Sequence, residues 1–146
     1  ITWQLSHQDK PVYYALYERY IQQRHADGSM YPPSYSQYKQ FLLCNWLEPF
    51  FLEFYEGDKL IAVAVTDILP HSLSAMYTFY DPDFEAYSLG TFAILTQLQL
   101  TIRMGRTYLY LGYQVDNCRK MNYKSSYLPH ERLKNKVWEK YTITSD

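Results

Sequence analysis

The chain has 146 residues, of which 47% are apolar and 18% aromatic, and its formal net charge is −1. This length suffices for one domain with its own core, and no apolar run approaches the ~20 residues that a membrane-spanning helix needs. The charge is unevenly distributed: residues 1–102 hold five basic and eleven acidic side chains, whereas residues 103–146 hold nine and four. This uneven charge distribution favours a basic face that binds phosphate groups, although a solvated charged tail explains the distribution equally well.

The chain contains two cysteines, Cys44 and Cys118. Their number and spacing match no metal-ligand motif and do not suggest a disulfide-rich secreted scaffold. We therefore expect two free thiols in a reducing cytoplasm.

The first half of the chain predicts two helices followed by a β-hairpin. Lys10 to Ala26 has an amphipathic pattern with a proline in its first turn, and Ser34 is a suitable cap for a second helix ending near Cys44. Phe50–Tyr55 and Leu60–Ile68 are β-rich runs separated by "EGDK", which is typical of a hairpin.

The second half predicts a strand, a buried helix and a further strand. Leu73–Tyr80 alternates in the manner of a strand, and Leu89–Arg103 is apolar around most of its circumference, so we expect it to be largely buried. Thr107–Leu111 follows as a strand, and the strand–helix–strand order favours a parallel pairing. The tail after Pro129 is polar with one anchor residue, Trp138, and is expected to include a final strand.

The start of the predicted buried helix is a candidate binding site for oxygen atoms. Ser88, Leu89 and Gly90 open this helix. A helix start carries unpaired N–H groups and partial positive charge, which suit a phosphate or a carbonyl oxygen. Gly90 has no side chain and lets a ligand approach the backbone closely. The alternative is a purely structural role, in which Ser88 and Gly90 form an ordinary helix cap.

The stretch "YLYLGYQVDNCRKMNYKSSY" (Tyr108–Tyr127) mixes basic and aromatic side chains. Lysines and arginines of this kind contact phosphates without reading sequence, and rings stack on unpaired bases. The candidate phosphate contacts are Lys120 and Lys124, with Arg119 behind them, and the candidate stacking residues are Tyr113 and Tyr123. Solvent exposure of the lysines and core packing of the tyrosines are the alternatives. Three further basic residues could extend this face: Arg132, Lys134 and Lys136.

Three motifs carry a resemblance to a known family. The segments "DPDF..YSLGTFAIL" (Asp81–Leu95), "YLYLGY" and "C.KMNYK..Y.P.E" are similar to the C-terminal domain of the arginyl-tRNA–protein transferase family. The "KMNYK" wording resembles its bacterial branch, the aspartate/glutamate leucyltransferases. The resemblance implies a mixed α/β fold of the GNAT-like type, as in the Gcn5-related N-acyltransferases, with a central mixed sheet flanked by helices.

The resemblance also implies an activity and its partners. Members transfer an amino acid from an aminoacyl-tRNA to the N-terminal amine of a protein, here one beginning with Asp or Glu, which marks it for degradation in the cytoplasm. Leucine is the expected donor amino acid from the branch alone, with arginine as the alternative. The cation that reads the acidic terminus is left open between Arg103, Arg106 and residues outside this chain, and so is the oligomeric state. No membrane partner is expected.

The resemblance further divides the chain. Residues 1–12 are expected to connect to a cysteine-rich N-terminal domain that is absent here, and residues 13–146 to form the transferase domain. No cofactor is expected in this domain besides the aminoacyl-tRNA co-substrate, whereas a metal or iron–sulfur site is possible in the N-terminal domain.

Aminoacyl transfer requires a group that binds the incoming amine near the start of the predicted buried helix. Asp81, at the end of the third predicted strand, is the leading candidate to bind the incoming α-ammonium or accept its proton, with Tyr80 beside it. A turn-forming aspartate before a proline is the alternative. Acetyl-CoA-dependent N-acetyltransfer and a non-catalytic tRNA-gripping module are the competing functions. Acetyl-CoA enzymes place a glycine-rich run before this helix, and "EAYSLGT" has one glycine and no arginine there.

Overall fold

The computed structural model describes residues 1–24, 32–42, 49–111, 127, 129–134 and 136–141. The chain divides into two compact units, residues 1–110 and residues 111–146, and each is described by itself.

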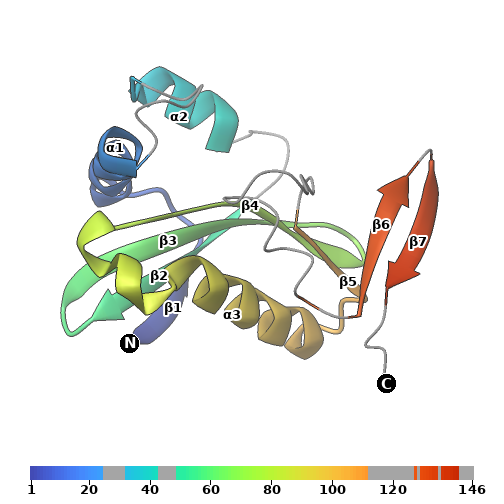
Figure 1. Cartoon of the computed structure of the whole chain (residues 1–146). Helices are drawn as coiled ribbons and strands as arrows, with labels where there is room; N and C mark the ends of the chain where they lie inside the picture. Colours follow the sequence, from blue (N-terminus) through green and yellow to red (C-terminus); the bar gives the residue numbers. More distant parts are fainter. Residues whose placement is uncertain (25–31, 43–48, 112–126, 128, 135, 142–146) are drawn as a thin grey trace. The chain divides into compact units, whose positions relative to one another are not determined.

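The first unit is built on a five-stranded sheet (Figure 1). Its strands follow the spatial order β1-β2-β3-β4-β5, and only the β4–β5 pair is parallel. The predicted hairpin and the predicted parallel pairing are both confirmed. The strands are β1 (Thr2–Ser6), β2 (Phe50–Glu56), β3 (Lys59–Ile68), β4 (Ser72–Tyr80) and β5 (Tyr108–Tyr110).

Helices cover both faces of this sheet, as Figure 1 shows. Because side chains alternate along a strand, Phe51, Val63 and Phe79 point to a face covered by α1 (Pro11–Arg24) and α2 (Tyr35–Leu42). We call this the α1 face. Phe50, Leu52, Ala62 and Ala64 point to the opposite side, the α3 face, where they pack with Leu89, Ala93 and Leu100 of α3 (Leu89–Arg103). Burial on both faces explains the nearly continuous apolar sequence of β2 and β3.

The two N-terminal helices agree with their sequence signals. The helix α1 begins at Pro11, and residues 25–31, where it was predicted to end, lie outside the described residues. The Ser34 hydroxyl accepts the N–H of Gln37 at 3.4 Å, so the predicted cap of α2 is confirmed. The predicted end of this helix near Cys44 lies outside the described residues.

The bounds of α3 agree with the prediction, but its expected burial does not. Leu95 is 49% exposed and Ile102 77% exposed, so the helix buries one stripe rather than most of its circumference. The buried stripe instead includes polar residues that hydrogen-bond within the helix or to the sheet, although the Gln97 Oε1 atom is buried without a partner among the described residues. The Thr96 and Thr101 hydroxyls donate to carbonyls one turn back, and the Gln97 amide donates to the Thr66 hydroxyl at 2.8 Å. No helix in the described ranges is both long and apolar enough to cross a membrane.

Two strand assignments differ from the sequence prediction. Residues 2–6, within the segment expected to be a connection, form β1 and pair with β2. The second unit contains a hairpin, whose last strand β7 (Val137–Tyr141) agrees with the expected final strand, whereas β6 (His130–Lys134) was not predicted. Trp138 is 51% exposed, so it does not serve as the buried anchor that we expected.

Candidate active site

The described pairing between β4 and β5 is parallel and short. Their pairing covers only Ser72–Ser74 with Tyr108–Tyr110, whereas β4 continues to Tyr80. Within the described residues, no strand pairs with β4 on this side beyond Ser74, so these residues leave an edge of backbone N–H and C=O groups without a strand partner among them. We call the segment Ala75–Tyr80 the open edge. It leads through the turn η1 (Pro82–Tyr87) to the start of α3.

A β-bulge lies where the open edge begins. Val65 pairs with Tyr77 and Thr66 pairs with Ala75, so Met76 is an extra residue on β4. A bulge bends its strand and leaves one residue out of the ladder, and such features often lie beside active sites. The backbone groups that have no strand partner among the described residues are candidates to bind the oxygen of a reacting carbonyl.

Asp67 of β3 lies beside this bulge and was not singled out by the sequence. It is paired in register with Ser74, which is itself in register with Tyr110 of β5. Residues in register share a face, and Asp67 alternates with Val65, so its side chain belongs to the α1 face. The residue is 7% exposed, and this burial raises the pKa of its carboxyl. An acidic residue near the end of the apolar run "LIAVAVTDI" is the signal that could have identified it.

Two exposed tyrosines lie on the neighbouring strand. Tyr108 is 49% exposed and Tyr110 is 39% exposed, and their ring centroids are 6.4 Å apart. They are in register with Ser72 and Ser74, so they point to the same face as Asp67. These rings are placed to contact an extended ligand that reaches the start of the open edge.

Asp81 lies at the other end of the open edge and is fully engaged. Its Oδ1 accepts the N–H of Asp83 at 3.0 Å, and its Oδ2 lies 2.8 Å from Arg19 and 3.3 Å from Lys59. Burial alone would raise the pKa of Asp81, which is 1% exposed, but these hydrogen bonds hold it below its usual range. The turn-forming alternative therefore describes what Asp81 does in the fold. Its predicted contact with the incoming amine stays a prediction.

Tyr80 precedes Asp81 and packs between the two cores. It is partly buried against both clusters, and its ring centroid lies 4.9 Å from that of Tyr20 on α1. A role in substrate contact also stays a prediction.

The start of α3 differs from a standard cap. Ser88 adopts a left-handed conformation, with φ of 52°, and its side chain makes no capping hydrogen bond. The first helical bond is donated by Phe92 to the Ser88 carbonyl, so the N–H groups of Leu89 and Gly90 lack partners within the helix. Leu89 buries its side chain in the α3-face core and can offer a ligand only its backbone. A Cβ atom added at Gly90 would meet nothing within 4 Å, so packing does not demand a glycine there.

Five of the predicted tRNA contacts lie outside the described residues. These are Tyr113, Arg119, Lys120, Tyr123 and Lys124, and their roles stay predictions. Of the further basic residues, Lys134 is engaged within the β6–β7 hairpin, where its Nζ lies 2.8 Å from the Tyr141 hydroxyl and 3.6 Å from Glu139. Within the described ranges, no group of three or more His, Cys, Asp or Glu residues could hold a metal ion.

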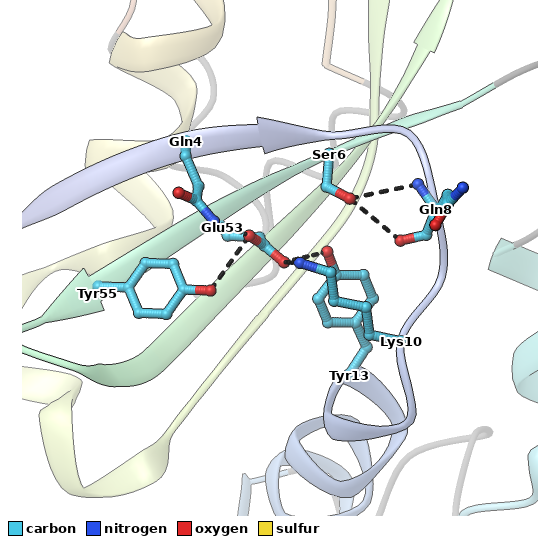
Figure 2. Close-up of polar contacts among 7 residues, drawn as sticks. All are labelled: Gln4, Ser6, Gln8, Lys10, Tyr13, Glu53 and Tyr55. Carbon is cyan, nitrogen blue, oxygen red and sulfur yellow. Dashed lines mark hydrogen bonds and ion pairs between the residues drawn. The ribbon is translucent and has the colours of Figure 1, made fainter.

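A second polar cluster surrounds Glu53 of β2 on the α1 face (Figure 2). Its carboxylate accepts hydrogen bonds from four side chains: Gln4 at 2.6 Å, Lys10 at 2.8 Å, Tyr55 at 3.2 Å and the hydroxyl of Tyr13. Burial alone would raise the pKa of Glu53, but the hydrogen bonds from Lys10, Tyr13 and Gln4 lower it. The cluster joins β1, β2 and the start of α1, so its role is to hold these elements together.

A solved structure confirms the fold that the resemblance implied. The chain is similar to the ribosomal-protein-S18-alanine N-acetyltransferase from Escherichia coli, with a TM-score of 0.59 and 18% identity over 86% of this chain and 76% of that one. At this identity the likeness concerns the fold alone. The chain therefore has the GNAT-like mixed α/β fold.

Curated relatives carry one shared name. An aspartate/glutamate leucyltransferase from Aeromonas hydrophila is 64% identical over 92% of this chain and 57% of the relative. A protein of the same name from a Shewanella species is 52% identical over 95% of this chain and 58% of the relative. The chain thus spans less than two thirds of the length of these relatives. A sequence model described as the arginine-tRNA-protein transferase C terminus matches residues 12–134, and the chain belongs to this family.

Proposed function

We propose that this chain is the acyl-transferring part of an aminoacyl-tRNA–protein transferase. It moves leucine from charged tRNA to the N-terminal amine of proteins that begin with Asp or Glu, and it thereby marks them for degradation in the cytoplasm. The observation that carries this proposal is the 64% identity over 92% of the chain to a relative named for that activity. Because the relatives are longer, the complete protein is the unit that performs the reaction.

The geometry of the open edge supports acyl transfer. The aminoacyl end of the tRNA would lie along Ala75–Tyr80, with a phosphate near the unpaired N–H groups at the start of α3 and the ester carbonyl near the bulge at Met76. The ester is already activated, so holding the amine beside it supplies much of the rate.

The residues singled out by the sequence are proposed to contact the donor and the substrate along the open edge. Ser88, Leu89 and Gly90 are proposed to present backbone groups to the donor. Tyr80 and Asp81 are proposed to contact the substrate at this end of the open edge, and the existing ion pairs of Asp81 weigh against it as a proton acceptor. The basic and aromatic stretch is proposed to grip the terminal nucleotides of the tRNA through Tyr113, Arg119, Lys120, Tyr123 and Lys124.

One observation favours a second candidate function. The structural likeness to an N-acetyltransferase is compatible with acetyl-CoA as donor. The segment "EAYSLGT" at the start of α3 has one glycine where enzymes of that kind use a glycine-rich run, and this disfavours a pyrophosphate cradle.

A transfer assay with the complete protein tests the proposal. Radiolabelled leucyl-tRNA is offered with peptides that begin with Asp, Glu or, as an isosteric control, Asn. We expect label on the Asp and Glu peptides and little on the Asn peptide. Arginyl-tRNA and acetyl-CoA are tested in parallel. Transfer from arginyl-tRNA alone would change the donor amino acid, and transfer from acetyl-CoA alone would replace the proposal with the second candidate.

A further inference from the structure

We propose that Asp67 is a catalytic residue that accepts the proton of the incoming α-ammonium group beside the last described β4–β5 pair, Ser74 with Tyr110. The inference rests on the proposed function and names a residue of that site. It moves proton acceptance away from Asp81, which lies at the far end of the open edge.

The position of Asp67 is set by three neighbouring strands. It is in register with Ser74, and Ser74 is the last residue of β4 that pairs with β5. The bulge residue Met76 follows two positions later. The carboxylate therefore lies beside the place where the ester carbonyl would meet unpaired backbone groups, and an amine arriving from the α1 face reaches both.

The surroundings of Asp67 contrast with those of the other buried carboxylates. Glu53 and Asp81 each receive several hydrogen bonds and at least one cation. For Asp67, no hydrogen bond or ion pair is found among the residues that the structure describes, although only 7% of its surface is exposed. The Asp67 oxygens are not among the fully buried atoms without a partner, so the little exposure that the residue keeps leaves the carboxylate within reach of a ligand. A largely buried carboxylate without a protein partner is typical of functional sites. An ammonium group would complete this site electrostatically.

The groups of the neighbouring strands that face Asp67 are serines and tyrosines. From β4 and β5 these are Ser72, Ser74, Tyr77, Tyr108 and Tyr110, which share its face. Burial raises the pKa of the Tyr77 hydroxyl. Burial is the cause of the raised pKa of Asp67 itself, with no contribution from a described charged group.

The step balances as an acyl transfer. The α-ammonium gives one proton to the Asp67 carboxylate, and the neutral amine attacks the ester carbonyl. The C–N bond forms and the ester C–O bond breaks, while the second nitrogen proton passes to the departing ribose oxygen. The carboxyl of Asp67 then loses its proton to solvent, so each turnover releases one proton. A carboxyl whose pKa is raised toward that of the amine, about 7.7–8.0, is better suited to this transfer.

The test uses the complete enzyme with Asp67→Asn and a matched control, Asp58→Asn, which removes an exposed carboxyl from the β2–β3 turn. Single-turnover transfer of leucine from leucyl-tRNA to an Asp-initiated peptide is measured from pH 6 to pH 9. We expect D67N to be slower by about 100-fold or more at pH 7, because a positioned base contributes roughly 10²–10⁴-fold. The deficit should shrink toward pH 9, where the amine is already neutral. D58N should match the wild type.

Each other outcome is decisive. A wild-type enzyme without transfer would sink the proposed function itself. An active wild type with D67N within threefold of it, or slower by the same factor at every pH, would overturn the role of Asp67. So would a melting temperature of D67N well below that of the wild type, because it would reveal a stabilising partner for the carboxylate.

Discussion

Two regions of one sheet bury a carboxylate in opposite ways. Around Glu53, at the β1–β2 edge, four side chains from three elements converge on the two oxygens. Around Asp67, at the β4–β5 edge, the described residues supply burial without a partner. Both residues lie on the α1 face, so the difference comes from their local neighbours.

This contrast separates a structural group from a candidate reactive one. A carboxylate whose oxygens are all occupied has little capacity left for a substrate, and its pKa is held low. A carboxylate buried without partners keeps its oxygens available and is more basic. The two regions should therefore respond to mutation in opposite directions: loss of Glu53 should cost stability, and loss of the Asp67 charge should not.

The largest expected effect on stability is that of Glu53→Ala. The change leaves the buried hydroxyl of Tyr13 and the amide of Gln4 without their acceptor, and it removes the partner of the partly exposed Lys10. We expect the free energy of unfolding to fall by about 2–3 kcal/mol, the upper range for leaving buried polar groups unsatisfied. Urea denaturation followed by circular dichroism measures it. The control is Glu56→Ala at the exposed end of the same strand, which should change stability by less than about 0.5 kcal/mol. Equal effects of the two variants would remove the structural role of the Glu53 cluster.

A smaller loss is expected for Asp81→Asn. Asparagine still accepts the N–H of Asp83 and so keeps the turn cap, but it no longer neutralises Arg19 and Lys59. Because both cations are partly exposed, we expect about 1–1.5 kcal/mol rather than the full cost of a buried pair. Asp83→Asn is the matched control, since its carboxylate is 70% exposed and lies 3.4 Å from Arg19. If high salt left the D81N deficit unchanged, the ion pairs would not be its cause.

The sequence predicted those parts of the fold that local signals determine. The "EGDK" hairpin, the Ser34 cap and both ends of α3 depend on residues a few positions apart, and each is confirmed. The segment 2–6 was missed because its strand exists through pairing with β2, about 50 residues away. The apolar circumference of α3 could not show that Leu95 faces solvent, because the choice of buried stripe depends on where the helix lies on the sheet.

The candidate site was harder to predict for the same reason. Arg19 and Asp81 are 62 positions apart, so no local pattern could show that the predicted amine-binding carboxylate is already paired. Asp67 becomes notable only when the register joins β3, β4 and β5 beside a bulge. The family motifs, in contrast, were recognisable from the sequence, because they are contiguous in it.

The smallest expected effect, the stability of Asp67→Asn, tests the comparison most directly. The folded-state pKa of Asp67 is raised, so protonation favours the folded protein: the wild type gains this contribution below the unfolded value near pH 3.9 and loses it as pH rises through the folded value. D67N should therefore match the wild type near pH 4 and be more stable at pH 7, by about 1 kcal/mol.

Glu53 has a lowered pKa and behaves oppositely: its contribution to stability is present above the unfolded pKa near 4.3 and is lost as pH falls through the folded pKa. E53Q should thus be less stable than the wild type at pH 7, with the gap narrowing on acidification. Urea titrations of both variants at pH 4 and pH 7 measure the two trends, and parallel trends would mean that the two carboxylates are buried in the same way.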